Sequence, residues 1–203
     1  MTHLSDRAIS GYLLSGELVI DPLLTPLQPA SVDLRLGPLV KHLIPGHYDP
    51  VKHESPAIRE EAIETLVLGP GQFLLACTFE WVEIPPPLVG IITGKSTLAR
   101  LGLQVEAAGY ADPGWKGHLT LELINLGPLM LVLRVGMPIC QIRFDYLTDL
   151  PEHLYGDPAL GSHYQDSVGP VEAIFSRPSS TSAAYLESKP LGPRGAEGSS
   201  TIR

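Results

Sequence analysis

The chain contains few cysteines, few basic residues and no long apolar run. Its two cysteines, Cys77 and Cys140, lie far apart in apolar segments, so we expect reduced core thiols and no disulfide. Lys and Arg total 14 against 22 Asp and Glu, which gives a net charge of −8 over 203 residues. This acidic balance argues against a nucleic-acid partner, because the phosphate backbone attracts basic surfaces. An anionic substrate would need a local basic pocket instead.

Signals for membranes, secretion and metal binding are missing as well. No apolar run approaches the length of a membrane span, and the N-terminus lacks the basic and apolar regions of a secretory signal. We therefore expect a cytoplasmic protein with no membrane partner. The seven histidines form no His-Glu-x-x-His motif, and two isolated cysteines cannot supply the His-x-Glu and Pro-Cys-x-x-Cys ligands of a zinc deaminase. We expect no metal bound by the chain itself, and no zinc.

What the chain does contain is a series of short strand patterns. Residues 4–16 have the pattern of one short helix, whereas residues 31–37, 118–123 and 139–146 alternate apolar with polar side chains. Strands of this kind at short spacing predict a mainly β fold, a compact barrel or sandwich, with a short N-terminal helix. Residues 176–203 are rich in Ser, Pro, Gly and Ala, so we expect a flexible tail there.

The stretch ITGKSTLARLG, residues 91–101, looks like the end of a phosphate-binding P-loop. That motif needs a glycine five residues before Gly94, where this chain has Val89, so the spacing fails. The local chemistry still suits the binding of an anion. Lys95 supplies a positive charge, and the backbone amides of the helical turn expected at 98–101 would point toward the bound anion. A capped helix start with a solvated lysine is the alternative interpretation.

Two carboxylates are candidates for chemistry. Glu122 lies in a strand whose other face is leucine, and a general acid/base at this position would need partial burial. A carboxylate on a solvated face is the alternative. Asp112 lies in the Gly- and Pro-rich loop 109–117, where it could accept a hydrogen bond from a sugar hydroxyl, although the same composition also makes a purely structural turn.

Five segments, taken in order, resemble one family. They read QPASVDLRLG, GKSTLARLGL, AGYADPGWKGHLTLEL, GMPICQIRF and YGDPALGSHYQ, and the match runs from about residue 28 to residue 170. Together they resemble the dCTP deaminases of the trimeric dUTPase superfamily, which differ from plain dUTPases by the Glu of TLEL. The resemblance implies a distorted β barrel of the dUTPase-like type in a single domain of residues 1–175. It also implies a homotrimer with shared active sites, and zinc-free hydrolytic deamination of dCTP to dUTP.

The resemblance also implies roles for individual residues. Glu122 would be the general acid/base, Ser96 would help to place the attacking water, and Arg100 would lie beside the catalytic carboxylate. Mg²⁺ would arrive with the triphosphate rather than in a cage built by the chain. The substrate-binding positions implied are Lys95, Thr97, Ala108, Asp112, Thr120, Gln141, Tyr155, His163 and Ser167.

Three positions depart from the family pattern, and a separate segment bears on which product is formed. His163 stands where the family usually has Lys, Ser167 where it usually has Gln, and Glu106 near its usual His, in a stretch that is one residue short. Residues 108–110 read Ala-Gly-Tyr, which favours members that continue from dUTP to dUMP and diphosphate and so supply dUMP for thymidylate synthesis. A dUTPase without deaminase activity, or a non-catalytic nucleotide-binding protein on the same scaffold, are the alternatives.

Overall fold

The computed structural model describes residues 2–49, 56–106 and 109–174. Two helices and twelve strands are assigned in these ranges, and all strand pairings between them are antiparallel. The predicted tail at 176–203 lies outside the described residues. In chain order the elements are α1 (Asp6–Ser15), β1 (Val19–Asp21), β2 (Leu27–Gln28), β3 (Ser31–Leu43), β4 (Ile58–Ala62), β5 (Thr65–Leu68), β6 (Phe73–Glu83), β7 (Leu88–Gly94), α2 (Ser96–Ala99), β8 (Leu103–Glu106), β9 (Tyr110–Ala111), β10 (Lys116–Asn125), β11 (Leu131–Arg134) and β12 (Pro138–Tyr146).

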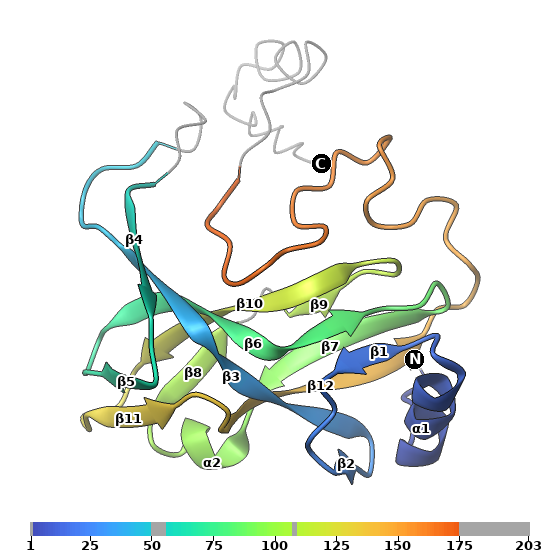
Figure 1. The fold of residues 1–203 in the computed structure, drawn as a ribbon, viewed down its shortest axis with the longest axis horizontal. Coiled ribbons are helices and arrows are strands. Elements are labelled where there is room, and N and C mark those ends of the chain that lie inside the picture. Colours follow the sequence, from blue (N-terminus) through green and yellow to red (C-terminus); the bar gives the residue numbers. More distant parts are fainter. Residues whose placement is uncertain (1, 50–55, 107–108, 175–203) are drawn as a thin grey trace, which may run out of the picture.

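Ten strands form one curled sheet (Figure 1). Its main path runs β8-β10-β6-β3-β12-β7-β9, with β1 added to β6 and both β2 and β4 added to β3, while β5 and β11 pair separately. The β3–β6 register shifts between Leu36 and Val40, and such an irregularity lets a long strand bend. The predicted mainly β fold with one short N-terminal helix is confirmed.

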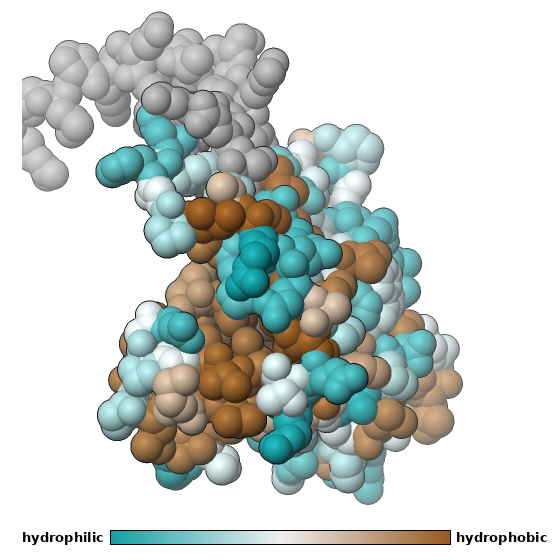
Figure 2. Space-filling model, turned by 60° about the vertical axis from the view of Figure 1, so that its left-hand side comes forward, coloured by the Kyte–Doolittle hydropathy of each residue, from teal (hydrophilic) through white to brown (hydrophobic). Residues whose placement is uncertain are grey.

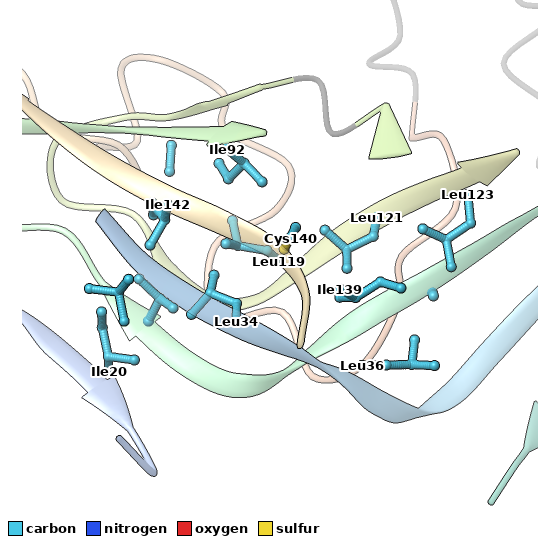
Figure 3. Packing of buried hydrophobic residues seen from close by; sticks show 14 of the residues in the cluster. Ile20, Leu34, Leu36, Ile92, Leu119, Leu121, Leu123, Ile139, Cys140 and Ile142 are labelled. Carbon is cyan, nitrogen blue, oxygen red and sulfur yellow. The ribbon is translucent and has the colours of Figure 1, made fainter. Parts of the chain in front are cut away.

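The core fills the inside of this curl. Leu119, Leu121 and Leu123 are buried on one face of β10, as the alternating pattern predicted, and their polar neighbours face the other way. Side chains from β3, β7 and β12 meet them (Figure 3). The two cysteines are free and buried, and desolvation raises the pKa of Cys77 to about 11, so both predicted core thiols are confirmed.

The alternation in β12 holds along most of the strand but fails at its end. Asp145 is buried at 1% exposure, whereas Tyr146 is 41% exposed. The N-terminal segment explains why Asp145 is buried, because the His3 ring nitrogen Nδ1 lies 2.5 Å from Asp145 Oδ1. Tyr146 instead packs near Tyr12 of α1, with ring centroids 6.2 Å apart. None of the helices within the described ranges is long and apolar enough to cross a membrane.

Candidate active site

A cavity of about 900 Å³ opens on the polar face of β10. Figure 1 shows the parts around it: the C-terminal segment, coloured orange, and the arm made by the end of β3 with β4 lie above β10. His118, Thr120 and Glu122 line the cavity from alternate positions of β10. The same period of two that buries the leucines therefore presents the polar side chains to one space.

Asp112 lines the cavity from the turn between β9 and β10. The amide of Trp115 donates to the Asp112 carbonyl at 3.0 Å, and Gly114 has a φ of 86°, which favours glycine. A Cβ on Gly114 would also come within 2.8 Å of the Leu154 Cβ. The loop is thus a tight turn and also a wall of the cavity, and burial raises the pKa of Asp112.

Tyr155 and Ser167 also line the cavity, and both are engaged with the backbone of Tyr164. The Tyr155 hydroxyl accepts from the Tyr164 amide at 3.1 Å, and the Ser167 hydroxyl donates to the Tyr164 carbonyl at 2.8 Å. Ser167 also forms an isolated parallel β-bridge with Gly117, and the Ser167 carbonyl accepts a hydrogen bond from the amide of His118. The serine found in place of the family's glutamine is therefore an anchor for its own loop.

Residues 167–174, which we call the C-terminal strap, form one wall of the cavity. The Val171 amide donates to Thr120 Oγ1 at 3.0 Å, and Lys41 Nζ donates to Glu172 Oε2 at 2.6 Å. These bonds join residues 51 and 131 positions apart in the chain. Local pattern carries no signal for contacts at such separations, and the sequence therefore did not predict the strap.

The segment GKSTLAR occupies a different part of the molecule. Among the described residues, those that line the cavity do not include Lys95, Ser96, Thr97 or Arg100. The predicted helical turn exists as α2 but begins two residues earlier, at Ser96, and in Figure 1 it lies on the opposite side of the sheet from the orange segment. Lys95 Nζ donates to Asp33 Oδ2 at 2.6 Å.

The remaining predicted positions within the described residues lie outside the cavity lining, and Gln141 is in register with Asp33, the partner of Lys95. Arg100 Nη1 donates to the Ser96 carbonyl at 3.0 Å, and Gln141 Nε2 donates to the Thr93 hydroxyl at 3.2 Å. The His163 ring lies edge-on to Tyr164, with centroids 6.1 Å apart, and is not one of the described cavity-lining residues. Ala108 lies outside the described residues. One copy of the chain therefore brings together five of the predicted positions: Asp112, Thr120, Glu122, Tyr155 and Ser167.

The chemistry available in the cavity centres on Glu122. Its neighbour in register on β6 is Leu75, which also lines the cavity, so Glu122 stands beside an apolar wall. A partly buried carboxylate in a space of this size can take a proton from a bound water and return it to a ligand. Over the described residues, His, Cys, Asp and Glu side chains form no group of three or more that could hold a metal ion.

Known proteins similar to this chain include dCTP deaminases. A family described as dCTP deaminase-like matches residues 3–147. A dUMP-forming dCTP deaminase of Acidothermus cellulolyticus is 42% identical over 177 residues, covering 83% of this chain and 92% of the relative. One from Methanopyrus kandleri, also named dUMP-forming, is 40% identical over 184 residues, covering 84% and 95%.

A solved structure agrees at the level of the fold. The crystal structure of 2'-deoxycytidine 5'-triphosphate deaminase from Agrobacterium tumefaciens superposes with a TM-score of 0.58 at 24% identity, over 71% of this chain and 48% of that one. This chain thus spans about half the length of that solved chain. With a family match over most of its length and relatives at this identity, the chain belongs to the dCTP deaminase-like family.

Proposed function

We propose that the protein hydrolyses the amino group of dCTP and continues to dUMP and diphosphate. The observation that carries the proposal is the position of Glu122, on the polar face of β10 in a cavity of about 900 Å³, within a chain of this family. Relatives 42% and 40% identical carry the name dUMP-forming dCTP deaminase. The Ala-Gly-Tyr sequence at 108–110 favours the same product.

Glu122 supplies the proton transfers of the deamination step. As a carboxylate it accepts a proton from water while the water oxygen bonds to C4 of cytosine, and the proton passes to N3. When the C4–N bond breaks, the C4 hydroxyl gives up its proton and Glu122 passes a proton to the amine, which leaves as ammonia while C4 becomes the carbonyl carbon of uracil. Asp112 and Tyr155, which line the same cavity, would bind the sugar, and Thr120 also lines this space.

The site is completed by a second copy of the chain in a homotrimer. Ser96 and Arg100, which would hold the water and the carboxylate, lie apart from the cavity of their own subunit. The amide of Leu126 donates to the Gly102 carbonyl at 2.8 Å, which puts the loop before β11 beside the end of α2. A head-to-tail ring of three copies can bring the α2 segment of one subunit to the cavity of the next.

Exposed apolar residues near α2 fit such an interface. Figure 2 shows apolar side chains gathered on the side of the molecule that carries β5 and β11. Such a gathering marks an interaction surface more often than isolated exposed residues do. We call this surface the apolar patch, and the exposed fractions of its members are Val67 52%, Leu101 43%, Leu126 66%, Met130 63% and Val132 49%.

Mg²⁺ and the cellular setting belong to the same proposal. A triphosphate carries its own Mg²⁺, which keeps several waters and needs few protein ligands, so the lack of a metal cage among the described residues fits this arrangement. Lys95 and Arg100 from the α2 segment would contribute positive charge, and His163 would add to it when protonated.

Two free buried thiols fit a reducing compartment, and we propose that the enzyme is cytoplasmic.

Incubation with dCTP and with dUTP in separate reactions, followed by separation of the products, tests the function. We expect dUMP and diphosphate from both substrates and ammonia from dCTP alone. Accumulation of dUTP as the final product would limit the activity to deamination. Turnover of dUTP without turnover of dCTP would identify a plain dUTPase, and binding without turnover of either would identify a non-catalytic protein.

A further inference from the structure

His118 lines the cavity, although neither a motif nor the family resemblance singled it out. It comes four residues before Glu122 on β10, and the alternation of the strand places both side chains on its polar face. Four residues span about 13 Å along an extended strand. The ladder with β6 shifts register between His118 and Thr120, and such irregularities often re-aim a side chain beside a site. The cavity therefore has two well-separated ionisable groups on one strand.

The imidazole ring of His118 is held in one orientation. Its Nδ1 lies 3.1 Å from the carbonyl oxygen of Thr78, a fully buried residue of β6. The ring also stands edge-on to Trp81, with centroids 5.7 Å apart. The backbone amide of His118 donates to the Ser167 carbonyl at 2.9 Å. These contacts fix the position of the ring before any ligand binds, and a group that must meet a reacting atom benefits from such fixing.

The same contacts fix the tautomer of His118. A carbonyl oxygen can only accept a hydrogen bond, so Nδ1 carries the hydrogen, and in the neutral ring Nε2 keeps a lone pair. Within the described residues Nε2 makes no hydrogen bond, and it is not fully buried, so a water in the cavity can reach it. A histidine with Nδ1–H on a fixed acceptor and an accessible Nε2 is arranged as a general base.

The proposed reaction needs a base at two places on the nucleotide. Deamination takes place at C4 of the cytosine, whereas release of diphosphate takes place at the α-phosphorus, on the far side of the sugar. A side chain close enough to C4 to exchange protons there is too far from the α-phosphorus to activate a water beside it. Glu122 therefore leaves the second step without a base, and a separate group of the cavity must supply it.

Few other groups of the cavity suit this second role. The hydroxyl oxygens of Thr120 and Tyr155 already accept hydrogen bonds from backbone amides. His47 lines the cavity from the loop after β3, but it makes no hydrogen bond within the described residues, so its ring is not oriented. Asp112 is the competing candidate, since its carboxylate also lines the cavity. The test must therefore separate His118 from Asp112.

We propose that His118 is the general base of the step that releases diphosphate. As a water oxygen bonds to the α-phosphorus of dUTP, Nε2 takes a proton from that water. The bond from the α-phosphorus to the oxygen that bridges to the β-phosphorus breaks, diphosphate leaves with that oxygen, and dUMP remains. The ring then returns its proton to solvent. This assignment rests on the dUMP-forming activity proposed above, and Glu122 stays the base of the deamination.

The test compares the two steps in full-length enzyme carrying His118→Asn or His118→Phe. Asn can still donate to the Thr78 carbonyl and Phe keeps a ring in place, but neither supplies a base. Each variant is incubated with dCTP, and ammonia, dUTP and dUMP are followed over time. The rate of dUTP hydrolysis should fall relative to that of ammonia release by a factor of about 10²–10⁴, so that dUTP accumulates. Continued ammonia release shows that the variant is folded.

His47→Asn is the matched control, because it removes the other histidine of the cavity, and it should keep the parent's ratio of the two rates. Parental ratios in both His118 variants would overturn the assignment, and a selective loss of dUTP hydrolysis in Asp112→Asn would then give the role to Asp112. A parent enzyme that itself stops at dUTP would refute the dUMP-forming function, and with it this step. That failure is seen without any variant, so the two failures are distinguishable.

Discussion

At the scale of single residues, the proposed chemistry depends most on Glu122. Glu122→Gln keeps the shape of the side chain and removes the proton transfer, so we expect deamination to fall by a factor of about 10²–10⁴. Binding of dCTP, measured by calorimetry, should persist because the other cavity residues are unchanged. A variant that deaminates within a few-fold of the parent would show that another group carries the proton.

Asp112 gives a residue-scale prediction for stability. Burial raises the pKa of Asp112, so the folded state holds its proton more strongly than the unfolded state does. The stability of the parent should therefore fall as pH rises from the ordinary Asp range through the raised pKa. Asp112→Asn cannot ionise, and its melting temperature should exceed that of the parent above this range, with the difference closing at lower pH. A constant difference at all pH values would contradict the assigned cause.

The residue scale is also where the sequence was most informative about the cavity. Glu122 and Thr120 follow from the period of two in one strand, and Asp112 follows from a loop whose Gly and Pro content predicts a tight turn, with Gly109, Gly114 and Gly117 at positive φ. The pattern failed at Asp145, whose buried carboxylate lies 2.5 Å from the ring of His3, 142 positions away, and 3.9 Å from the guanidinium of Arg143. A polar residue is buried when a distant partner compensates it, and local periodicity cannot show that partner.

At the scale of elements, one ion pair, between Lys41 on β3 and Glu172, helps to hold the C-terminal strap. The hydrogen bond from Lys41 holds the pKa of Glu172 below its usual range, so the contribution of this pair is present above the unfolded pKa of glutamate. That contribution is lost as pH falls through the lower, folded pKa. The two side chains are 13% and 27% exposed, and we expect the pair to contribute about 1 kcal/mol or less.

Glu172→Gln should therefore loosen the strap without unfolding the sheet. Hydrogen exchange at the Val171 amide, which donates to Thr120, should become several-fold faster, while the amides of β10 and β6 keep their protection. Glu61→Gln on β4 is a suitable control, because it removes a nearby carboxylate that pairs with His42 and Arg59 instead of with Lys41. Equal exchange at Val171 in parent and Glu172→Gln would mean that the ion pair does not hold the strap.

At the scale of the whole molecule, the sequence predicted the strands but not which strands pair with one another or in which register. The curl of the sheet depends on long-range pairings such as β3 with β6 and β12 with β7, whose registers are not set by any one segment. The same limit applies to the site. The resemblance assigned Ser96, Arg100 and Glu122 to one site, yet α2 and the cavity lie on different parts of one subunit.

This separation makes a prediction about assembly that subunit mixing can test. We expect light scattering to give three times the 21.9 kDa of one chain. Glu122→Gln and Arg100→Met should each be inactive alone, because every site lacks one of the two groups. The two variants are then unfolded, mixed in equal amounts and refolded together. If subunits combine at random in a head-to-tail ring, about a quarter of the sites should have an intact Glu122 from one subunit and an intact Arg100 from the next. Recovery near that fraction would place the two groups on different subunits, whereas no recovery from refolded trimers, or full activity from a monomer, would put the complete site within one chain.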